Sequence, residues 1–171
     1  MKSFAEFRKR RGGQPLRLFL WYNTSVMEFR KFIKSLGDAL GMRLENAGGA
    51  CALDIDGVTV MLHDADDLVF LSAEIGPPPP EDGLEALFRT ALKANWLYRG
   101  TGGATLAINP EDGCIWLEKY NFLERLDGEK GVEMVTRFAD TAKTWRELVA
   151  GFKPEVPSGG EYPCNLLVRQ V

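Results

Sequence analysis

A run of four prolines followed by an amphipathic stretch constrains the fold more than any other part of this sequence. The prolines occupy residues 77–80, directly before the stretch EDGLEALFRTALKANWL at residues 81–97. Proline cannot donate to a sheet ladder and keeps the residue before it extended, so a strand has to end here. Asp82 is suited to the N-cap of the next element, and Glu85 completes a capping box. The sequence therefore predicts a central helix over residues 81–97.

The apolar residues of this helix recur at three- and four-residue spacings, which place them on one face. They are Leu84, Leu87, Phe88, Ala91 and Leu92. Glu85, Arg89 and Lys93 remain to face water, so we expect the helix to be covered on more than one side. Two interpretations are open, a helix buried under a sheet in a monomer and a helix shared between two subunits. We favour the shared helix.

The length and the charge of the chain limit the class of protein to which it can belong. A chain of 171 residues forms one domain by default and can build a core without disulfides. The first 25 residues hold six basic residues and one acidic residue, a net charge of +5, whereas the other 146 hold 15 basic and 23 acidic residues, a net charge of −8. An acidic body argues against nucleic acid or an anionic membrane as the main partner.

The cysteines and the apolar runs indicate a cytoplasmic protein. Cys51, Cys114 and Cys164 do not have the spacing of a zinc site, and their odd number indicates a reducing compartment. No apolar run approaches the roughly 18 to 20 residues of a membrane helix.

Residues 1–26 form a basic extension that can be interpreted in several ways. RKRR at residues 8–11 followed by LRLFLWY at residues 16–22 has the charge order of an export signal, but the apolar part is short and interrupted by Arg17. We therefore expect either a disordered arm or a start codon assigned too early, with Met27 as the working start. A nucleic-acid contact is the minor alternative, because charge clusters are usually solvated. Residues 27–152 are predicted to form the folded domain.

An amphipathic helix is predicted over residues 27–44, with Ser25 as its cap and Gly41 marking its end. Its apolar stripe consists of Phe29, Phe32, Ile33, Leu36, Ala39 and Leu40. Most such stripes belong to a core. This one carries more large side chains than a small domain usually needs from a terminal helix, so we expect part of it to be exposed.

Alternating apolar residues predict a three-stranded meander over residues 51–75. Asp56 and Gly57 form a two-residue hairpin turn that needs positive φ. A loop at residues 64–67 separates the second strand from the third. Leu68 and Phe70 place apolar side chains on the second face of the sheet, so helices or a partner should cover both faces.

The remainder of the chain predicts two more strands and a last helix. After a loop at residues 100–103, strands are expected at residues 104–108 and 114–120, and the helix at residues 129–150. A Pro/Gly-rich tail covers residues 153–171. The predicted fold class is α+β, in the order helix, three-stranded antiparallel meander, helix, two strands, helix.

Residues for catalysis are scarce in this sequence. His63 is its single histidine and lies beside the acidic residues of 64–67, which more often form a solvated turn than a metal or acid–base site. The Gly-rich loop at residues 100–103 follows a helix and opens a strand, the reverse of a phosphate-binding loop. A binding function is therefore the better prediction, with no cofactor and no bound metal.

The order of elements and several short motifs resemble the class I type III secretion chaperones, the family of the Tir chaperone. The motifs span residues 27–150, and their order is more specific than any one of them. They are SLGDALGM at 35–42, CALDID at 51–56, LVFLSAEIG before the prolines at 68–76, LFRTALKANW at 87–96, GGATLAINPEDG at 102–113, and Phe138 with Trp145 and Arg146. The four prolines, the basic extension and the tail depart from the pattern of the family.

This resemblance implies a non-enzymatic homodimer in the bacterial cytoplasm that holds the amino-terminal segment of a secreted effector in extended form. The implied dimer interface is the central helix and the fourth strand, with Leu84, Leu87, Phe88, Ala91, Leu92, Asn95, Leu106 and Ile108. The implied effector grooves are the first helix and the outward strand faces, with Phe29, Phe32, Ile33, Leu36, Leu53 and Trp116. For these groove residues the competing interpretation is a sealed core.

Two other classes of function stay open at this point. One is a relative of the same fold that binds another bacterial protein without any role in secretion. The other is a small enzyme that uses His63 and the neighbouring aspartates.

Overall fold

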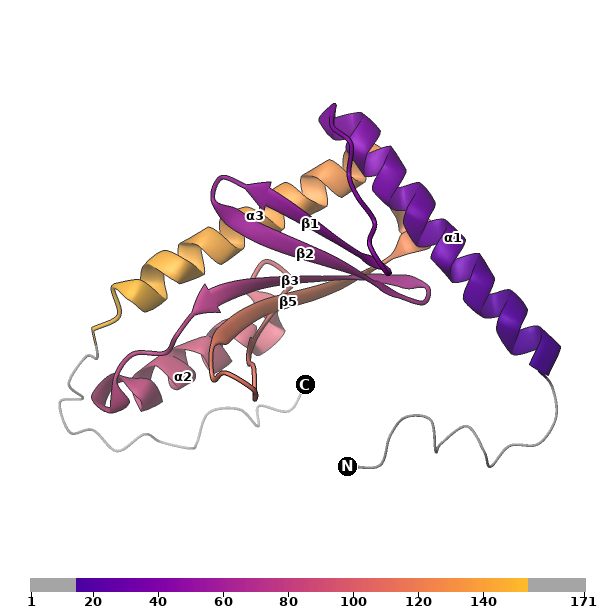
Figure 1. The fold of residues 1–171 in the computed structure, drawn as a ribbon. Helices are drawn as coiled ribbons and strands as arrows, with labels where there is room; N and C mark the ends of the chain where they lie inside the picture. The colour runs from indigo at the N-terminus through magenta and orange to yellow at the C-terminus, as the bar shows by residue number, and fades with distance from the viewer. Residues whose placement is uncertain (1–14, 154–171) are drawn as a thin grey trace, which may run out of the picture.

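The computed structural model of this chain describes residues 15–153, so the predicted tail and most of the basic extension lie outside the described residues. The predicted α+β fold class and order of elements are confirmed (Figure 1). The elements are α1 (Pro15–Leu40), β1 (Ala50–Ile55), β2 (Val58–Ala65), β3 (Leu68–Gly76), α2 (Glu81–Asn95), the 3-10 helix η2 (Trp96–Tyr98), β4 (Thr105–Ile108), β5 (Ile115–Phe122), the 3-10 helix η3 (Leu123–Arg125) and α3 (Gly128–Ala150).

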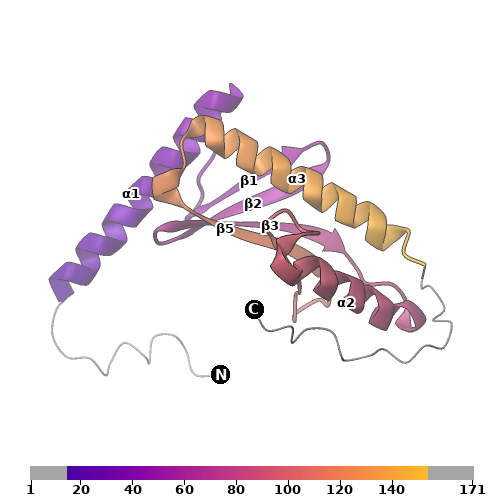
Figure 2. The same ribbon diagram turned by 180° about the vertical axis from the view of Figure 1, so that it is seen from behind.

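The five strands form one antiparallel sheet in the order β1-β2-β3-β5-β4, so β1 and β4 are its edges. Helices α2 and α3 lie on one side of the sheet, behind the strands in Figure 1 and in front of them in Figure 2, while α1 crosses one end of the sheet. Within residues 15–153, no helix is long and apolar enough to cross a membrane.

Two tight turns set the register of the meander. Asp56 and Gly57 have φ values of 51° and 80°, the positive values that a two-residue turn between antiparallel strands requires. A second two-residue turn joins β2 to β3, because Ala65 pairs directly with Leu68. The loop predicted at residues 64–67 is therefore shorter than expected, and His63 lies within β2 rather than at the edge of a turn.

The predicted start of α1 and both predicted N-caps need correction. Helix α1 begins at Pro15, so Ser25 lies inside the helix and does not cap it. Helix α2 begins at Glu81 with Pro80 at the N-cap position and no side-chain cap hydrogen bond, so Asp82 belongs to the first turn.

The predicted end of the first helix is confirmed at Gly41. This glycine has φ of +68°, and its N–H donates to the Asp38 carbonyl. The N–H of Met42 donates to the carbonyl of Gly37, which completes a Schellman motif.

One apolar core joins α1, α3, part of α2 and the face of the sheet toward α2 and α3. Phe29, Phe32, Ile33 and Leu36 of α1 are all buried in this core. Their predicted partial exposure is therefore corrected, because α3 lies directly against this stripe. Glycines permit the close approach: a Cβ at Gly131 would lie 2.9 Å from the ring of Phe32, and one at Gly128 would lie 2.5 Å from the Ser35 carbonyl.

Candidate protein-binding surfaces

Within residues 15–153, no helix covers the outer face of the sheet, which is the face turned away from α2 and α3. Side chains alternate between the two faces of a strand. On the inner face, residues such as Val60, Leu71 and Leu117 are fully buried. On the outer face, Tyr120 is 61% exposed and Phe122 is 44% exposed. Helices of the described chain cover the inner face only, so cover of the outer face by a partner stays a prediction.

Apolar and aromatic side chains line up across the outer face. Cross-strand pairing places His63 beside Phe70 and Phe70 beside Tyr120, and in the next row Leu68 is beside Phe122. Neighbours of this kind on one face of a sheet contact each other. We define the outer-face patch as Met61, His63, Leu68, Phe70, Tyr120 and Phe122.

The guanidinium of Arg125 covers one end of this patch, 5.0 Å from the centre of the Phe122 ring. At the opposite end, Trp116 is half-buried, and its indole N–H is buried without a hydrogen-bond partner. An unpaired buried donor of this kind costs free energy.

The two edges of the sheet differ in their free backbone groups. The two-residue turn makes Ile55 and Val58 a hydrogen-bonded pair, so alternate residues of β1 point their N–H and C=O groups away from β2. At Ala50 these groups are bonded to Ala47. At Ala52 and Asp54, no backbone partner is present among residues 15–153. This part of β1 is an open edge.

The edge at β4 is closed by a side chain. The amide of Asn95 donates to the Leu106 carbonyl at 3.1 Å and accepts from the Leu106 N–H at 2.9 Å. Asn95 therefore occupies the backbone groups that a further strand would use. Strand addition to this sheet is favoured at β1.

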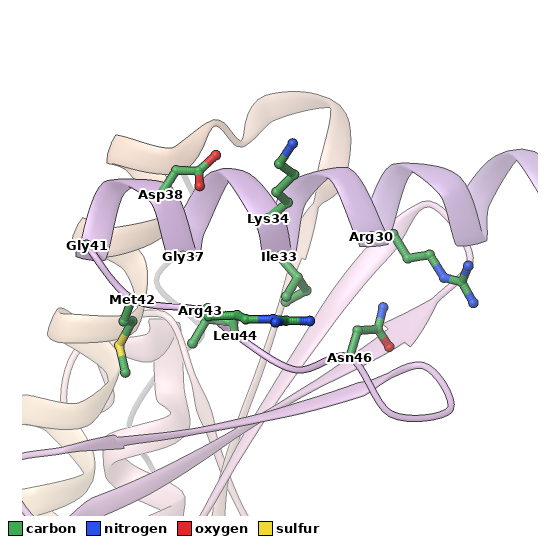
Figure 3. Close-up of a pocket in the computed structure, with 10 residues that line it drawn as sticks. All are labelled: Arg30, Ile33, Lys34, Gly37, Asp38, Gly41, Met42, Arg43, Leu44 and Asn46. Atoms are coloured by element: carbon green, nitrogen blue, oxygen red, sulfur yellow. The ribbon is translucent and has the colours of Figure 1, made fainter.

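Two clefts flank the segment that leaves α1. The first lies between α1 and residues 41–46 and is shown in Figure 3. The second lies between residues 42–47 and β1, and its lining includes Ala50, Ala52 and Met61. Met42, Arg43 and Leu44 line both clefts. Because Met61 also belongs to the outer-face patch, the second cleft joins the open edge to this patch.

A second exposed apolar surface lies at the end of α2. Leu92 is 69% exposed, and Leu97 and Tyr98 have positive φ values of 52° and 55°, which turn the chain sharply after the helix. We define the α2 patch by its exposed large apolar residues, which are Leu92, Trp96, Leu97, Tyr98 and Ile108.

The residues predicted for a dimer interface divide into three groups. Leu87 and Leu106 are buried in the core of the same chain, and Asn95 bonds to β4. Leu92 and Ile108 are exposed in the α2 patch. Leu84, Phe88 and Ala91 are half-buried.

The residues predicted for effector grooves are mostly inside the molecule. Those on α1 are buried, and so is Leu53, which lies on the inner face of β1. Trp116 lies on the outer face. The outward strand faces were implied as part of the grooves, but of the residues on this outer face only Trp116 was named. The alternation of Trp116, Tyr120 and Phe122 along β5 was a signal for the other two.

His63 and its acidic neighbour do not converge on one site. Consecutive strand residues point to opposite faces, so His63 lies on the outer face and Asp64 on the inner face. The pKa of the Asp64 carboxyl is raised by burial and, to a lesser extent, by the charge of Asp66. Within the described residues, no three His, Cys, Asp or Glu side chains are grouped so that they could hold a metal ion.

Comparisons with known proteins agree with this arrangement of elements. The model of the Tir chaperone protein (CesT) family matches residues 31–146. The Chlamydia pneumoniae protein CPj0713/CpB0740 is 28% identical over 120 residues, which cover 67% of this chain and 91% of that protein.

Solved structures share the fold at low sequence identity. A chain of the HopA1–SchA chaperone–effector complex has a TM-score of 0.59 and 19% identity, covering 72% of this chain and 97% of that chain. A chain of the complex between the Yersinia pestis type III secretion chaperone SycH and a stable fragment of YscM2 has a TM-score of 0.57 and 17% identity, covering 68% of this chain and 98% of that chain.

Proposed function

Because the chain belongs to the Tir chaperone protein (CesT) family, as its sequence motifs indicate, we propose that it is a chaperone for a type III secreted effector. It holds the amino-terminal segment of that effector in an extended form. The observation that carries the proposal is the uncovered outer face of the sheet, with its aromatic rows beside the open edge of β1. Exposed apolar surface of this kind is typical of a site for a protein partner.

The client segment binds as an added strand and then crosses the outer face. Main-chain groups of the client pair with Ala52 and Asp54, which sets the register, and its apolar side chains contact the outer-face patch and Trp116. The client loses conformational entropy when it is ordered, and this cost keeps the complex releasable.

The proposed chaperone acts as a homodimer through the α2 patch. Leu92, Trp96 and Ile108 contact the partner subunit, with Leu84, Phe88 and Ala91 beside them. Leu87, Asn95 and Leu106 support the interface from within each subunit. Closure of the β4 edge by Asn95 supports contact through side chains rather than through a sheet that continues between subunits.

We also propose that the protein has no enzymatic activity, needs no cofactor and works in the bacterial cytoplasm. The opposite orientation of His63 and Asp64 supports a binding role for His63, within the outer-face patch. The excess of acidic residues after residue 25 supports a protein partner rather than nucleic acid.

Capture of the client tests this function. The tagged full chain is used to isolate its partner from the bacterium that encodes it, and the bound region is mapped by limited proteolysis and mass spectrometry. We expect the bound region to be the amino-terminal segment of a secreted protein. The variant with both Tyr120→Ala and Phe122→Ala should capture at least about tenfold less, which corresponds to about 1.4 kcal/mol.

Leu148→Ala is the matched control, because Leu148 is an exposed apolar residue on α3, away from the outer face. It should capture the client as the wild type does. A client that binds only through a folded domain, or equal capture by the double variant, would contradict the proposal.

A further inference from the structure

We propose that Arg30 and Arg43 hold a carboxylate of the client, so that the client segment crossing the cleft beside α1 is acidic as well as apolar. This inference rests on the proposed function and adds the chemistry of the bound segment. Arg30 comes from α1 and Arg43 from the segment that follows it, and both line the same cleft of about 610 Å³.

The two arginines face the same cleft. Figure 3 shows the side chain of Arg43 lying beneath Ile33 and the guanidinium of Arg30 directed to the same side of α1. Lys34 and Asp38 also line this cleft, so its lining holds three cations and one carboxylate. The charged residues of the lining are Arg30, Lys34 and Arg43 against Asp38, a net charge of +2.

Neither arginine has a carboxylate partner among the residues whose side chains the structure describes. Most ion pairs that do form there join residues three or four positions apart on a helix. For Arg30, the helix neighbours at positions 26, 27, 33 and 34 include no acidic residue. Two cations thus stay unpaired within a body that carries an excess of acidic residues.

The apolar residues that line the cleft can contact an apolar side chain of the client next to that carboxylate. Ile33 is buried, Leu44 is half-buried and Met42 is exposed beside them. Asn46 accepts the N–H of Gly49 through its Oδ1 at 3.1 Å, which leaves its amide N–H groups available to donate. Two guanidinium groups and an amide donor match the acceptors of an aspartate or glutamate.

The position of Arg43 connects this site to the strand-binding edge. Arg43 lines both clefts, so a client strand that pairs with β1 passes this residue on its way to α1. Surface ion pairs add little affinity but help to choose the partner and its orientation. The two arginines therefore contribute selectivity, while the apolar contacts and the strand pairing contribute most of the affinity.

Peptide selection on the full chain tests the inference. A phage library of random 12-residue peptides is selected against the wild type, and we expect the recovered peptides to be enriched in apolar residues and in Asp or Glu. Selection against the variant with Arg30→Gln and Arg43→Gln should keep the apolar enrichment and lose the acidic enrichment. Lys143→Gln is the matched control and should keep both, because Lys143 is an exposed residue of α3 that lines neither cleft.

Affinities of one recovered peptide complete the test. Replacing its acidic residue by the amide should weaken binding to the wild type three- to tenfold, as measured by fluorescence anisotropy, and leave binding to the double variant unchanged. Arg30 and Arg43 are exposed, so the double variant should melt like the wild type.

The outcomes separate this inference from the function on which it rests. Apolar enrichment without acidic enrichment on the wild type overturns the inference alone, and so does acidic enrichment that persists on the double variant. The absence of any enrichment on the wild type contradicts the proposed function as well.

Discussion

At the scale of single residues, Asn95 and Asp64 show how one side chain decides what a strand can do. Asn95 places its amide against both backbone groups of Leu106, so its donor and its acceptor are both used. Asp64 is in the opposite situation, because its Oδ1 is buried without a hydrogen-bond partner. The first residue completes an edge strand, and the second leaves an unpaired charge near the core.

Asp64→Asn is expected to stabilise the fold at neutral pH. Burial and the nearby Asp66 raise the pKa of Asp64, so the folded chain binds a proton there more readily than the unfolded chain. The ionised carboxyl therefore lowers stability above its folded pKa, and this loss is relieved as the pH falls through that pKa. We expect a gain of less than about 1 kcal/mol, because solvent screens a partly exposed group.

Urea unfolding at a series of pH values measures this gain, which should shrink as the pH is lowered. Asp140→Asn, at an exposed site on α3, is the control and should show no such trend. A loss of stability in Asp64→Asn at pH 7 would contradict the expectation.

At the scale of elements, α1 is mainly a core helix. Its stripe packs against α3, where Gly128 and Gly131 allow the two helices to approach closely. The face it turns to solvent carries charged residues, and of these Arg30, Lys34 and Asp38 line the cleft between α1 and residues 41–46. Helix α1 thus contributes mainly to the core, and its contribution to the proposed binding surface is limited to the cleft that Arg30 lines.

Phe29→Ala is expected to lower the free energy of unfolding by roughly 3–5 kcal/mol, because truncating a buried phenylalanine removes its packing and leaves a cavity. Phe29 is 0% exposed. Tyr120→Ala, at an exposed aromatic residue, should change stability far less and weaken client binding instead. Thermal melting and client capture on both variants separate the two roles. A melting temperature of Phe29→Ala equal to that of the wild type would contradict the core role and support the interpretation that α1 lines an effector groove.

At the scale of the whole molecule, the chain presents two unpartnered apolar surfaces that need different partners. The α2 patch is formed by exposed residues from α2, η2 and β4. The outer-face patch lies on three adjacent strands and joins the open edge of β1. A dimer that uses the α2 patch leaves the outer-face patch free for a client.

Leu92→Asp is expected to convert a dimer to a folded monomer, because it places an unpaired charge in an apolar contact and this costs several kcal/mol in order of magnitude. Leu87→Asp is not suitable, because Leu87 is 1% exposed and its replacement would unfold the subunit. Light scattering measures the mass, and circular dichroism checks the fold. Leu148→Asp, on α3, should leave the mass unchanged, and a wild type that is monomeric at every accessible concentration would contradict the dimer.

The sequence by itself determined the elements and their order. Period-two alternation, the Asp56-Gly57 turn, the prolines before α2 and Gly41 after α1 are local signals, and each acts within a few residues along the chain. The N-caps predicted for α1 and α2 were wrong because a cap depends on the backbone geometry at its position, and Ser25 and Asp82 each lie inside a helix.

Tertiary structure decided which apolar surfaces are covered. Periodicity shows that Phe29 and Tyr120 each lie on an apolar face, but it does not show what packs on that face. The sheet places α2 and α3 on one side, so the first residue is buried and the second is exposed. Likewise, Asn95 was predicted to face a second subunit, and only the position of β4 next to the end of α2 brings its amide to Leu106. Coverage depends on contacts between residues far apart in the chain, and a local pattern carries no information on them.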